Sequence, residues 1–345
     1  MTITDPQEKP QHPPVKPSAI GVLLINLGTP STCDKRAVRQ FLAEFLSDRR
    51  VIELSPLLWK PILYGLILTT RPAKVARAYQ SIWLQAQDES PLRFHSRQQA
   101  ENLARRLRSH PQIIVEWAMR YGQPSIQSAL EKLRDQGCRR LLIAPLYPQY
   151  SATSTASVLD KTFDVLKTWR NQPALRTLPP YYDHPAYISA LAGTLWQYLS
   201  TTENKPDVIL ASYHGIPKDC VSKGDPYYCH CAKTTRLLRE KLDVDEHYLP
   251  MTFQSRFGAK KWLEPATDAT LKQLARQGAK KVAVITPGFS ADCLETLEEM
   301  AIQNRELFIK HGGGEYHVIP CLNASETGMN MLETLIRQEL QGWIG

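Results

Sequence analysis

The sequence of 345 residues lacks a long hydrophobic run. A transmembrane helix needs about 18 or more consecutive, largely uncharged apolar residues. The nearest candidate, residues 51–68, is interrupted by Glu53, Pro56, Lys60 and Pro61. The first 17 residues contain five prolines and little apolar content, unlike the hydrophobic segment of a secretory signal. We therefore expect a cytoplasmic protein in which residues 1–18 form a disordered, proline-rich arm.

Paired C-x-x-C motifs are also missing, although there are seven cysteines. An odd number of cysteines without a secretory signal is typical of reduced thiols. The one tight cluster is Cys229 and Cys231, with Cys220 nine residues before Cys229. A [2Fe–2S] cluster on Cys220, Cys229 and Cys231 would need a fourth ligand, such as Cys138 or a non-cysteine group. We keep this cluster as an alternative and expect neither a cluster nor an organic cofactor.

Standard nucleic-acid-binding motifs are absent too, and the basic residues are scattered. The net charge of +8 is compatible with a nucleic acid, an anionic membrane or a carboxylated ligand as partner. The missing motifs argue against the nucleic acid. With 43% hydrophobic and 22% charged residues the composition is that of a globular protein, and the length suggests two domains.

Short apolar, β-rich runs alternate with segments of helical periodicity. The expected strands are residues 20–26, 113–118, 140–144, 208–212, 248–253, 281–286 and 317–320. The expected helices are residues 35–46, 97–108, 126–136, 185–199, 234–242, 268–277 and 294–308. This alternation predicts an α/β fold in which parallel sheets are flanked by helices.

One internal similarity indicates two related halves. Residues 136–140 (QGCRR) and residues 277–281 (QGAKK) each follow a predicted helix and precede an apolar strand that ends at a proline. The glycine of each motif suits the end of a helix. Ligands of open α/β sheets bind beyond the carboxyl ends of the strands. We therefore expect residues 26–30, 147–151, 213–217 and 287–292 to surround one cleft.

Chemically capable side chains lie at two of these strand ends. His214 follows a strand and precedes a glycine, where it can act as a general base, bind a metal, or make structural hydrogen bonds in a turn. Glu295 and Glu299 are four residues apart on a predicted helix and share a face. Acidic residues near a helix start are also common without a function. If that face lines the cleft, the carboxylates oppose His214, which suits divalent-metal handling or proton transfer.

Two further segments are unusual for loops. Residues 146–151 combine tyrosines and prolines around Tyr147 and Ser151, which fits either a rigid packed loop or an aromatic wall for a flat ligand. Trp262 offers a second wall. Residues 54–64 are strongly apolar and include Leu57 and Leu58. This segment either packs in the core or forms an exposed lip that admits a hydrophobic substrate or contacts a bilayer.

Five motifs, in their order along the chain, resemble those of the ferrochelatase family. They are residues 24–30 (LINLGTP), 147–151 (YPQYS), 212–217 (SYHGIP) with 224–227 (GDPY) following, 252–258 (TFQSRFG) and 287–297 (PGFSADCLETL). The resemblance runs from about residue 20 to residue 323. Residues 291–299 (ADCLETLEE) are most similar to the proteobacterial branch of the family, which acts on protoporphyrin.

The resemblance implies an enzyme that inserts Fe²⁺ into protoporphyrin IX, forming protohaem and releasing two protons, in the last step of haem biosynthesis. His214 and Glu295 match the catalytic residues of the family. His214 would accept pyrrole protons, bind the metal, or both, and Glu295 would anchor the metal or the proton exit together with Glu299. The positions that match contacts around the macrocycle are Leu27, Leu57, Leu58, Arg120, Tyr121, Tyr147, Ser151 and Trp262.

The resemblance also implies two Rossmann-like lobes of the chelatase type, with the active-site cleft between them. We expect residues 19–160 to form the first lobe, with the lip at about residues 51–68. Residues 161–322 would form the second lobe, and residues 323–345 a helix that packs back on the first. Protoporphyrin IX and ferrous iron are the expected partners, with peripheral contact between the lip and the inner membrane.

Some positions depart from the family pattern. Cys293 stands where some relatives have histidine, and Gln303 replaces the third acidic residue of a carboxylate ridge. The last cysteine is Cys321, so the C-terminal cluster ligands of some relatives are missing. Two alternatives therefore stay open: a chelatase for coproporphyrin or another tetrapyrrole, and a non-catalytic haem or porphyrin carrier on the same fold.

Overall fold

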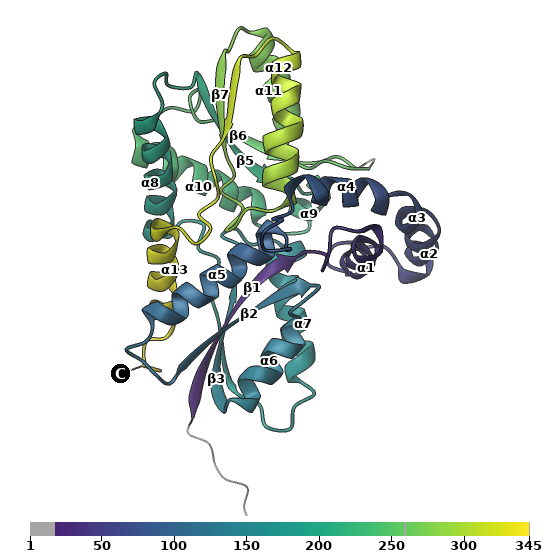
Figure 1. Ribbon diagram of the computed structural model, residues 1–345, viewed down its shortest axis with the longest axis vertical. Helices are drawn as coiled ribbons and strands as arrows, with labels where there is room; N and C mark the ends of the chain where they lie inside the picture. Colours follow the sequence, from purple (N-terminus) through teal and green to yellow (C-terminus); the bar gives the residue numbers. More distant parts are fainter. Residues whose placement is uncertain (1–17, 259, 345) are drawn as a thin grey trace, which may run out of the picture.

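The computed structural model describes residues 18–258 and 260–344, so the predicted arm lies outside the described residues except for Ser18. Two four-stranded sheets, arranged one after the other along the long axis of the molecule, form its centre (Figure 1). All strand pairs in both sheets are parallel. The predicted α/β fold with helix-flanked parallel sheets is confirmed.

The first sheet has the strand order β2-β1-β3-β4. Its central strand is buried along almost its whole length, which explains why its sequence is a continuous apolar run rather than an alternating one. We call this sheet with its helices the first lobe. Its strands are β1 (Ala19–Gly28), β2 (Ile113–Tyr121), β3 (Cys138–Pro145) and β4 (Ala174–Thr177), and its helices include α5 (Pro91–Arg106), α6 (Ile126–Asp135) and α7 (Ser157–Leu166).

The second sheet has the equivalent order β6-β5-β7-β8. We call this sheet with its helices the second lobe. Its strands are β5 (Val208–His214), β6 (Met251–Gln254), β7 (Lys281–Ile285) and β8 (Glu315–Val318). Its helices are α8 (Pro185–Thr201), α9 (Lys218–Ser222), α10 (Tyr227–Leu242), α11 (Thr267–Arg276), the π-helix η3 (Glu295–Asn304) and α12 (Arg305–Lys310).

The shared topology agrees with the internal similarity seen in the sequence. Gly137 lies between α6 and β3, and Gly278 occupies the matching place between α11 and β7. Both have a positive φ, the backbone conformation in which glycine commonly ends a helix. The repeated motif therefore marks the same helix-to-strand turn in each lobe.

The predicted boundary between the lobes needs correction. The sequence placed it between residues 160 and 161, but β4 pairs with β3 through residues 174–177, so the first sheet ends after Thr177. The strand was not predicted because it is short, lies at the sheet edge and contains Arg176 among its four residues. Such an edge strand carries little hydrophobic signal.

The lip projects to one side of the first lobe (Figure 1). It follows α1 (Lys35–Leu46) and consists of α2 (Pro56–Ile62), the π-helix η1 (Leu63–Ile67) and α3 (Leu68–Thr70), after which α4 (Pro72–Ile82) returns to the body. Leu57 and Leu58 are 87% and 68% exposed, whereas Leu63 and Leu68 are buried against α1. Of the two readings of this segment, the structure shows the exposed lip.

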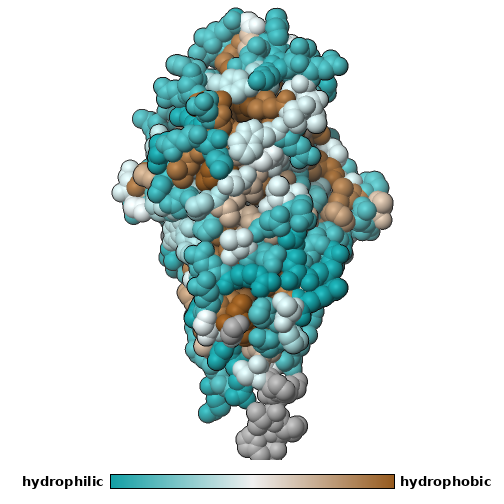
Figure 2. Space-filling view, turned by 90° about the vertical axis from the view of Figure 1, so that its left-hand side faces the viewer, coloured by the Kyte–Doolittle hydropathy of each residue, from teal (hydrophilic) through white to brown (hydrophobic). Residues whose placement is uncertain are grey.

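The C-terminal helix α13 (Glu326–Glu339) packs against α8 and α5 and so bridges both lobes. One continuous hydrophobic cluster runs from Ile20 and Leu142 of the first sheet, past Tyr187 on α8, to Ile209 of the second sheet. Figure 2 shows the face that carries α8 and α13, where hydrophobic residues form separate patches among hydrophilic ones. Within the described residues, no helix is long and apolar enough to span a bilayer.

Candidate functional site

The carboxyl ends of three strands meet between the lobes. Gly288, just after β7, lies so close to its neighbours that an added Cβ would sit 3.6 Å from the Tyr213 ring of β5 and 3.7 Å from Oε1 of Gln149, beyond β3. The predicted meeting of the strand ends is therefore seen in the structure. Side chains from both lobes can reach a ligand placed there.

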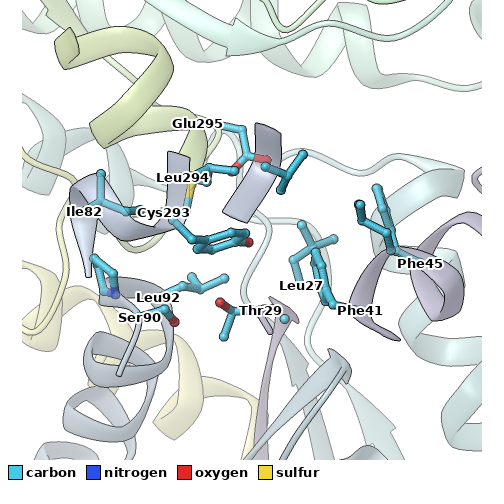
Figure 3. A pocket seen from close by; sticks show the side chains of 15 residues that line it. Leu27, Thr29, Phe41, Phe45, Ile82, Ser90, Leu92, Cys293, Leu294 and Glu295 are labelled. Atoms are coloured by element: carbon cyan, nitrogen blue, oxygen red, sulfur yellow. The ribbon is translucent and has the colours of Figure 1, made fainter. Parts of the chain in front are cut away.

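A cavity of about 150 Å³ lies between the end of β1, helices α1 and α4, the start of α5 and the start of η3. Leu27 and Thr29 enter it from the end of β1, and Glu295 and Cys293 enter from the second lobe (Figure 3). Most of its remaining lining is apolar or aromatic, including Phe41, Val75, Tyr79, Ile82 and Leu92. Its volume is below the roughly 300–1,000 Å³ of ordinary ligand pockets. A large flat ligand would therefore not fit entirely within this cavity.

His214 is held at the end of β5 by its own neighbour. Its Nδ1 lies 2.6 Å from the carbonyl oxygen of Gly215. Because a carbonyl oxygen accepts hydrogen bonds, Nδ1 must carry the proton, and the neutral ring keeps its lone pair on Nε2. Gly215 itself cannot be larger, since an added Cβ would lie 2.9 Å from the Gln254 carbonyl oxygen and 3.2 Å from the Trp262 ring.

Two carboxylates stand on η3 near His214. Glu295 is the first residue of this π-helix and Glu299 follows four residues later, which keeps the two side chains on one face. Burial raises the pKa of Glu299, and the negative charge of Glu295 raises it further. Hydrogen bonds from Ser255 and the electrostatic interaction with His214 lower the pKa of Glu299 but do not offset the burial. The three side chains thus interact electrostatically.

Glu295 also affects the groups that surround the cavity. Tyr79 on α4 is buried, and its pKa is raised first by burial and then by the charge of Glu295. The thiol of Cys293 has a raised pKa for the same two reasons, in the same order. Both groups therefore stay neutral near pH 7.

The candidate iron ligands are not preassembled. Among residues 18–258 and 260–344, no three His, Cys, Asp or Glu side chains are arranged to hold one metal ion. The alternative cluster ligands diverge, because Cys229 is exposed and Cys231 is buried on α10. Residues two apart on a helix point in different directions.

Arg120 and Tyr121 are committed to a buried polar network at the end of β2. The guanidinium of Arg120 forms an ion pair with Asp48 and donates to the Ser157 carbonyl and hydroxyl at 3.0 and 2.7 Å. Its Cζ atom lies 4.4 Å from the centre of the Tyr121 ring. The Tyr121 hydroxyl donates to Asp48 at 2.8 Å. Both predicted macrocycle contacts thus face Asp48.

The other residues predicted to contact the macrocycle lie in different surroundings. Leu27 lines the cavity. Trp262 donates from Nε1 to the Phe257 carbonyl at 2.9 Å, and its ring centre lies 4.8 Å from that of Phe257. Ser151 is buried, with its hydroxyl donated to Asp225 at 2.9 Å. Tyr147 is partly buried, and its hydroxyl is a buried polar atom without a hydrogen-bond partner among the residues that the structure describes.

The chain is similar to known proteins of one family. Residues 19–340 match the model of the ferrochelatase family. The chain is 55% identical to a ferrochelatase of Rhizobium meliloti over 334 residues, which cover 97% of this chain and 98% of that protein. It is 53% identical to a ferrochelatase of Agrobacterium fabrum over 333 residues, which cover 96% and 97% of the two chains.

The chain belongs to the ferrochelatase family. The family resemblance drawn from the sequence motifs is therefore confirmed. Among solved structures, SirB from Bacillus subtilis with Fe3+ matches with a TM-score of 0.53 and 12% identity, over 94% of this chain and 97% of that chain. CbiX, the terminal enzyme for biosynthesis of siroheme in denitrifying bacteria, matches with a TM-score of 0.50 and 13% identity, over 93% and 100%. At such low identity these two similarities support the chelatase fold alone.

Several residues at the site of this ferrochelatase-family chain were not predicted from its sequence. Tyr79 lies on α4, far along the chain from every family motif, and contacts the cavity through the packing of α1 against α4. Asp48 follows α1 in a stretch of mixed charges that resembles an ordinary solvated loop. Ser255 falls within the motif 252–258, two residues after the predicted strand 248–253. Its place at a strand end could have marked it as a site residue.

Proposed function

We propose that this chain inserts Fe²⁺ into protoporphyrin IX, with His214 as the base that accepts pyrrole protons and Glu295 as the residue that receives the iron. The observation that carries the proposal is that the end of β6 joins His214 to both carboxylate-bearing residues. Gln254 pairs with His214 across the sheet and donates to the Glu295 carbonyl at 3.4 Å. The next residue, Ser255, donates its N–H to Glu299 at 2.8 Å. Family membership supports the reaction, since the family model spans residues 19–340.

The proton-accepting role rests on the tautomer of His214. With the Nδ1 proton donated to the Gly215 carbonyl, Nε2 is available as an acceptor. A neutral imidazole can accept one pyrrole proton near neutral pH. The second proton needs another acceptor, and Glu299 is suited to hold one because burial raises the pKa of its carboxyl. The stoichiometry is then one Fe²⁺ in and two protons out for each porphyrin.

The iron-receiving role follows from the position of Glu295. It is an anionic side chain lining a largely apolar cavity, where little competing water can screen its charge. Carboxylate oxygen is a suitable ligand for a partly hydrated divalent ion. Passing Fe²⁺ from Glu295 to the four porphyrin nitrogens exchanges oxygen ligands for nitrogen ligands as the protons leave.

The macrocycle would be held by the apolar and aromatic groups around the cleft. Leu27 and the aromatic residues of the cavity would contact one edge, and Trp262 and Tyr147 would form the walls. Metal insertion requires a planar porphyrin to bend, and contacts with its periphery can supply the necessary binding energy. Arg120 and Tyr121 would support this wall through Asp48.

We further propose that the lip rests on an anionic membrane surface as a peripheral contact on the cytoplasmic side. Leu57, Leu58, Ile62 and Leu66 are exposed on consecutive turns of the lip, and Lys60 lies among them. Apolar side chains flanked by a basic residue are typical of interfacial helices. The hydrophobic porphyrin could then enter the cleft directly from the membrane.

The decisive experiment is an anaerobic insertion assay with the purified full chain, Fe²⁺ and either protoporphyrin IX or coproporphyrin. We expect the absorption spectrum of protohaem with protoporphyrin. Turnover with coproporphyrin alone would select the rival chelatase. Tight binding of both porphyrins without turnover would instead indicate a carrier.

A further inference from the structure

The loop that follows β3 is attached to the opposite lobe through a buried carboxylate. We name residues 146–152 the wall loop, because Tyr147 and Ser151 belong to it. Oδ2 of Asp225 accepts hydrogen bonds from the Ser151 hydroxyl at 2.9 Å and from the Ala152 N–H at 2.8 Å. Its other oxygen accepts from the Tyr227 N–H at 3.0 Å, at the start of α10. One carboxylate thus joins the wall loop to a helix of the second lobe.

Helix α10 adds two more attachments along the same face. His230 and Thr234 are four residues apart and therefore stand above one another on the helix. Nδ1 of His230 accepts from the Tyr150 N–H at 3.1 Å. Oγ1 of Thr234 accepts from Nε2 of Gln149 at 3.1 Å.

Local packing holds the acceptors on α10 in place. The His230 ring is stacked on Tyr182, with 3.6 Å between ring centres and 11° between planes. Oγ1 of Thr234 lies 2.7 Å from the Tyr182 carbonyl oxygen and 3.0 Å from the His230 carbonyl oxygen, and its hydroxyl donates to these carbonyls. The helix therefore presents fixed acceptors to the wall loop.

We propose that Asp225, assisted by His230 and Thr234, is a positioning residue that sets the distance between the wall loop and the catalytic side chains of the second lobe. The inference rests on the proposed function, in which Tyr147 contacts the porphyrin. His214 and Glu295 belong to the second lobe and the wall loop to the first, so hydrogen bonds between the lobes fix the width of the site. Ser151 then acts by holding the loop, because its proton is donated to Asp225 rather than to a substrate.

Substitution of Asp225 by Asn separates the two roles of this carboxylate. An amide of the same shape has one accepting oxygen and one donating nitrogen. It can keep the hydrogen bond to the Tyr227 N–H, but its NH₂ group then opposes the Ala152 N–H. The helix start is preserved and the wall loop is released. The matched control is Asp245→Asn, since Asp245 accepts from the His247 and Tyr248 N–H groups within its own turn and has no contact with the wall loop.

Three measurements on the full-length chain test the proposal: hydrogen exchange, porphyrin titration and the steady-state KM for Fe²⁺. Hydrogen exchange of the peptide covering residues 147–156 reports whether the loop is held, and titration with iron-free protoporphyrin IX reports its affinity. In Asp225→Asn we expect faster exchange in that peptide and about tenfold weaker porphyrin binding, the effect of losing hydrogen bonds to a charged group. The KM for Fe²⁺ should stay unchanged, and Asp245→Asn should match the wild type in all three respects.

Each outcome decides a separate point. Unchanged exchange in Asp225→Asn would overturn the attachment, whatever the activity. Faster exchange with unchanged porphyrin affinity would overturn the positioning role. Should the wild type bind no porphyrin, the proposed function fails, and the positioning role with it, while the exchange data still decide the attachment. Should Asp225→Asn fail to fold, Ser151→Ala replaces it, with a smaller loss of affinity of about threefold expected from removal of one hydrogen bond.

Discussion

Ser255 donates both of its available protons to Glu299. Its N–H lies 2.8 Å from Oε1, and its hydroxyl donates to Oε2. To do so, Ser255 adopts a φ of 66°, a left-handed backbone conformation that is uncommon for residues other than glycine. The loop after β6 thus keeps an unfavourable conformation in which it orients one carboxylate of the site.

Replacement of Ser255 by alanine should therefore reduce iron insertion without unfolding the protein. The N–H bond to Glu299 remains, and the hydroxyl bond is lost. We expect kcat/KM for Fe²⁺ to fall about tenfold, as for the loss of one charge-assisted hydrogen bond. Steady-state kinetics at several iron concentrations measure this, with the exposed Ser222→Ala as control. Equal kcat/KM values in Ser255→Ala and the wild type would remove Ser255 from the site.

His214→Ala should abolish most of the turnover. A positioned general base typically contributes about 10²- to 10⁴-fold, so we expect kcat to fall at least 100-fold while porphyrin affinity changes little. Anaerobic stopped-flow absorption measures the rate, and fluorescence titration measures the affinity. The exposed His247→Ala is the control. A loss of less than tenfold would show that another group accepts the protons.

Asp48→Asn should weaken the fold in a manner that depends on pH. Burial raises the pKa of Asp48, but hydrogen bonds from Ser157, the Arg50 N–H and Tyr121, with the charge of Arg120, lower it below its ordinary value of 3.8. The ionised form therefore stabilises the folded state above pH 3.8, and this contribution is lost as the pH falls through the lower, folded-state pKa. At pH 7 the variant should lose about 3 kcal/mol in free energy of unfolding, because it leaves Arg120 unpaired.

Urea unfolding between pH 7 and pH 3 tests this prediction. The difference between the wild type and Asp48→Asn should narrow below pH 4. Asp160→Asn is the matched control, since it removes an exposed carboxylate that pairs with Arg50 and should cost less than about 1 kcal/mol. A difference that stays constant down to pH 3 would contradict the role of the Asp48 charge.

The double variant Leu57→Ser and Leu58→Ser should reduce membrane binding. Each exposed leucine that enters a bilayer interface contributes about 1.5–3 kcal/mol, so losing two should weaken vesicle binding at least tenfold. Flotation with phosphatidylcholine vesicles that contain phosphatidylglycerol measures this. Phe163→Ser removes an exposed apolar side chain on α7, outside the lip, and should have no effect. Should the wild type itself fail to float, the lip has another role.

The sequence predicted the parts of the fold that depend on local pattern. The bounds of α1 agree with the prediction because an amphipathic helix with Asp34 as N-cap carries its own signals. The central strands were predicted because both of their faces are buried. In contrast, β4 and the π-helices η1 and η2 (Ala152–Ala156) depend on tertiary contacts, and periodicity did not separate them from other segments.

The residues of the site were predicted or missed for the same reasons. His214 and Glu295 were predicted because strand ends and family motifs mark them. The partners that orient the site come from distant segments: Asp48 and Arg120 are 72 residues apart, and Asp225 and Ser151 are 74 apart. Contacts of this kind follow from the packing of whole elements, and a single sequence does not reveal them.

The hydrophobic core shared by the two sheets, together with α13, limits how substrates can enter the site and products can leave it. Because the two sheets bury one continuous cluster, separating them would expose much apolar surface, so the body cannot open like a hinge. The residues that flank the lip instead touch the second lobe through exposed contacts. Glu53, before the lip, forms an ion pair with Lys223, and Arg71, after it, has its Cζ atom 5.9 Å from the centre of the Phe257 ring. Salt weakens exposed ion pairs. The two lobes should therefore stay together while the exposed contacts beside the lip break and re-form. Added salt should weaken these contacts and speed the exchange of porphyrin for haem.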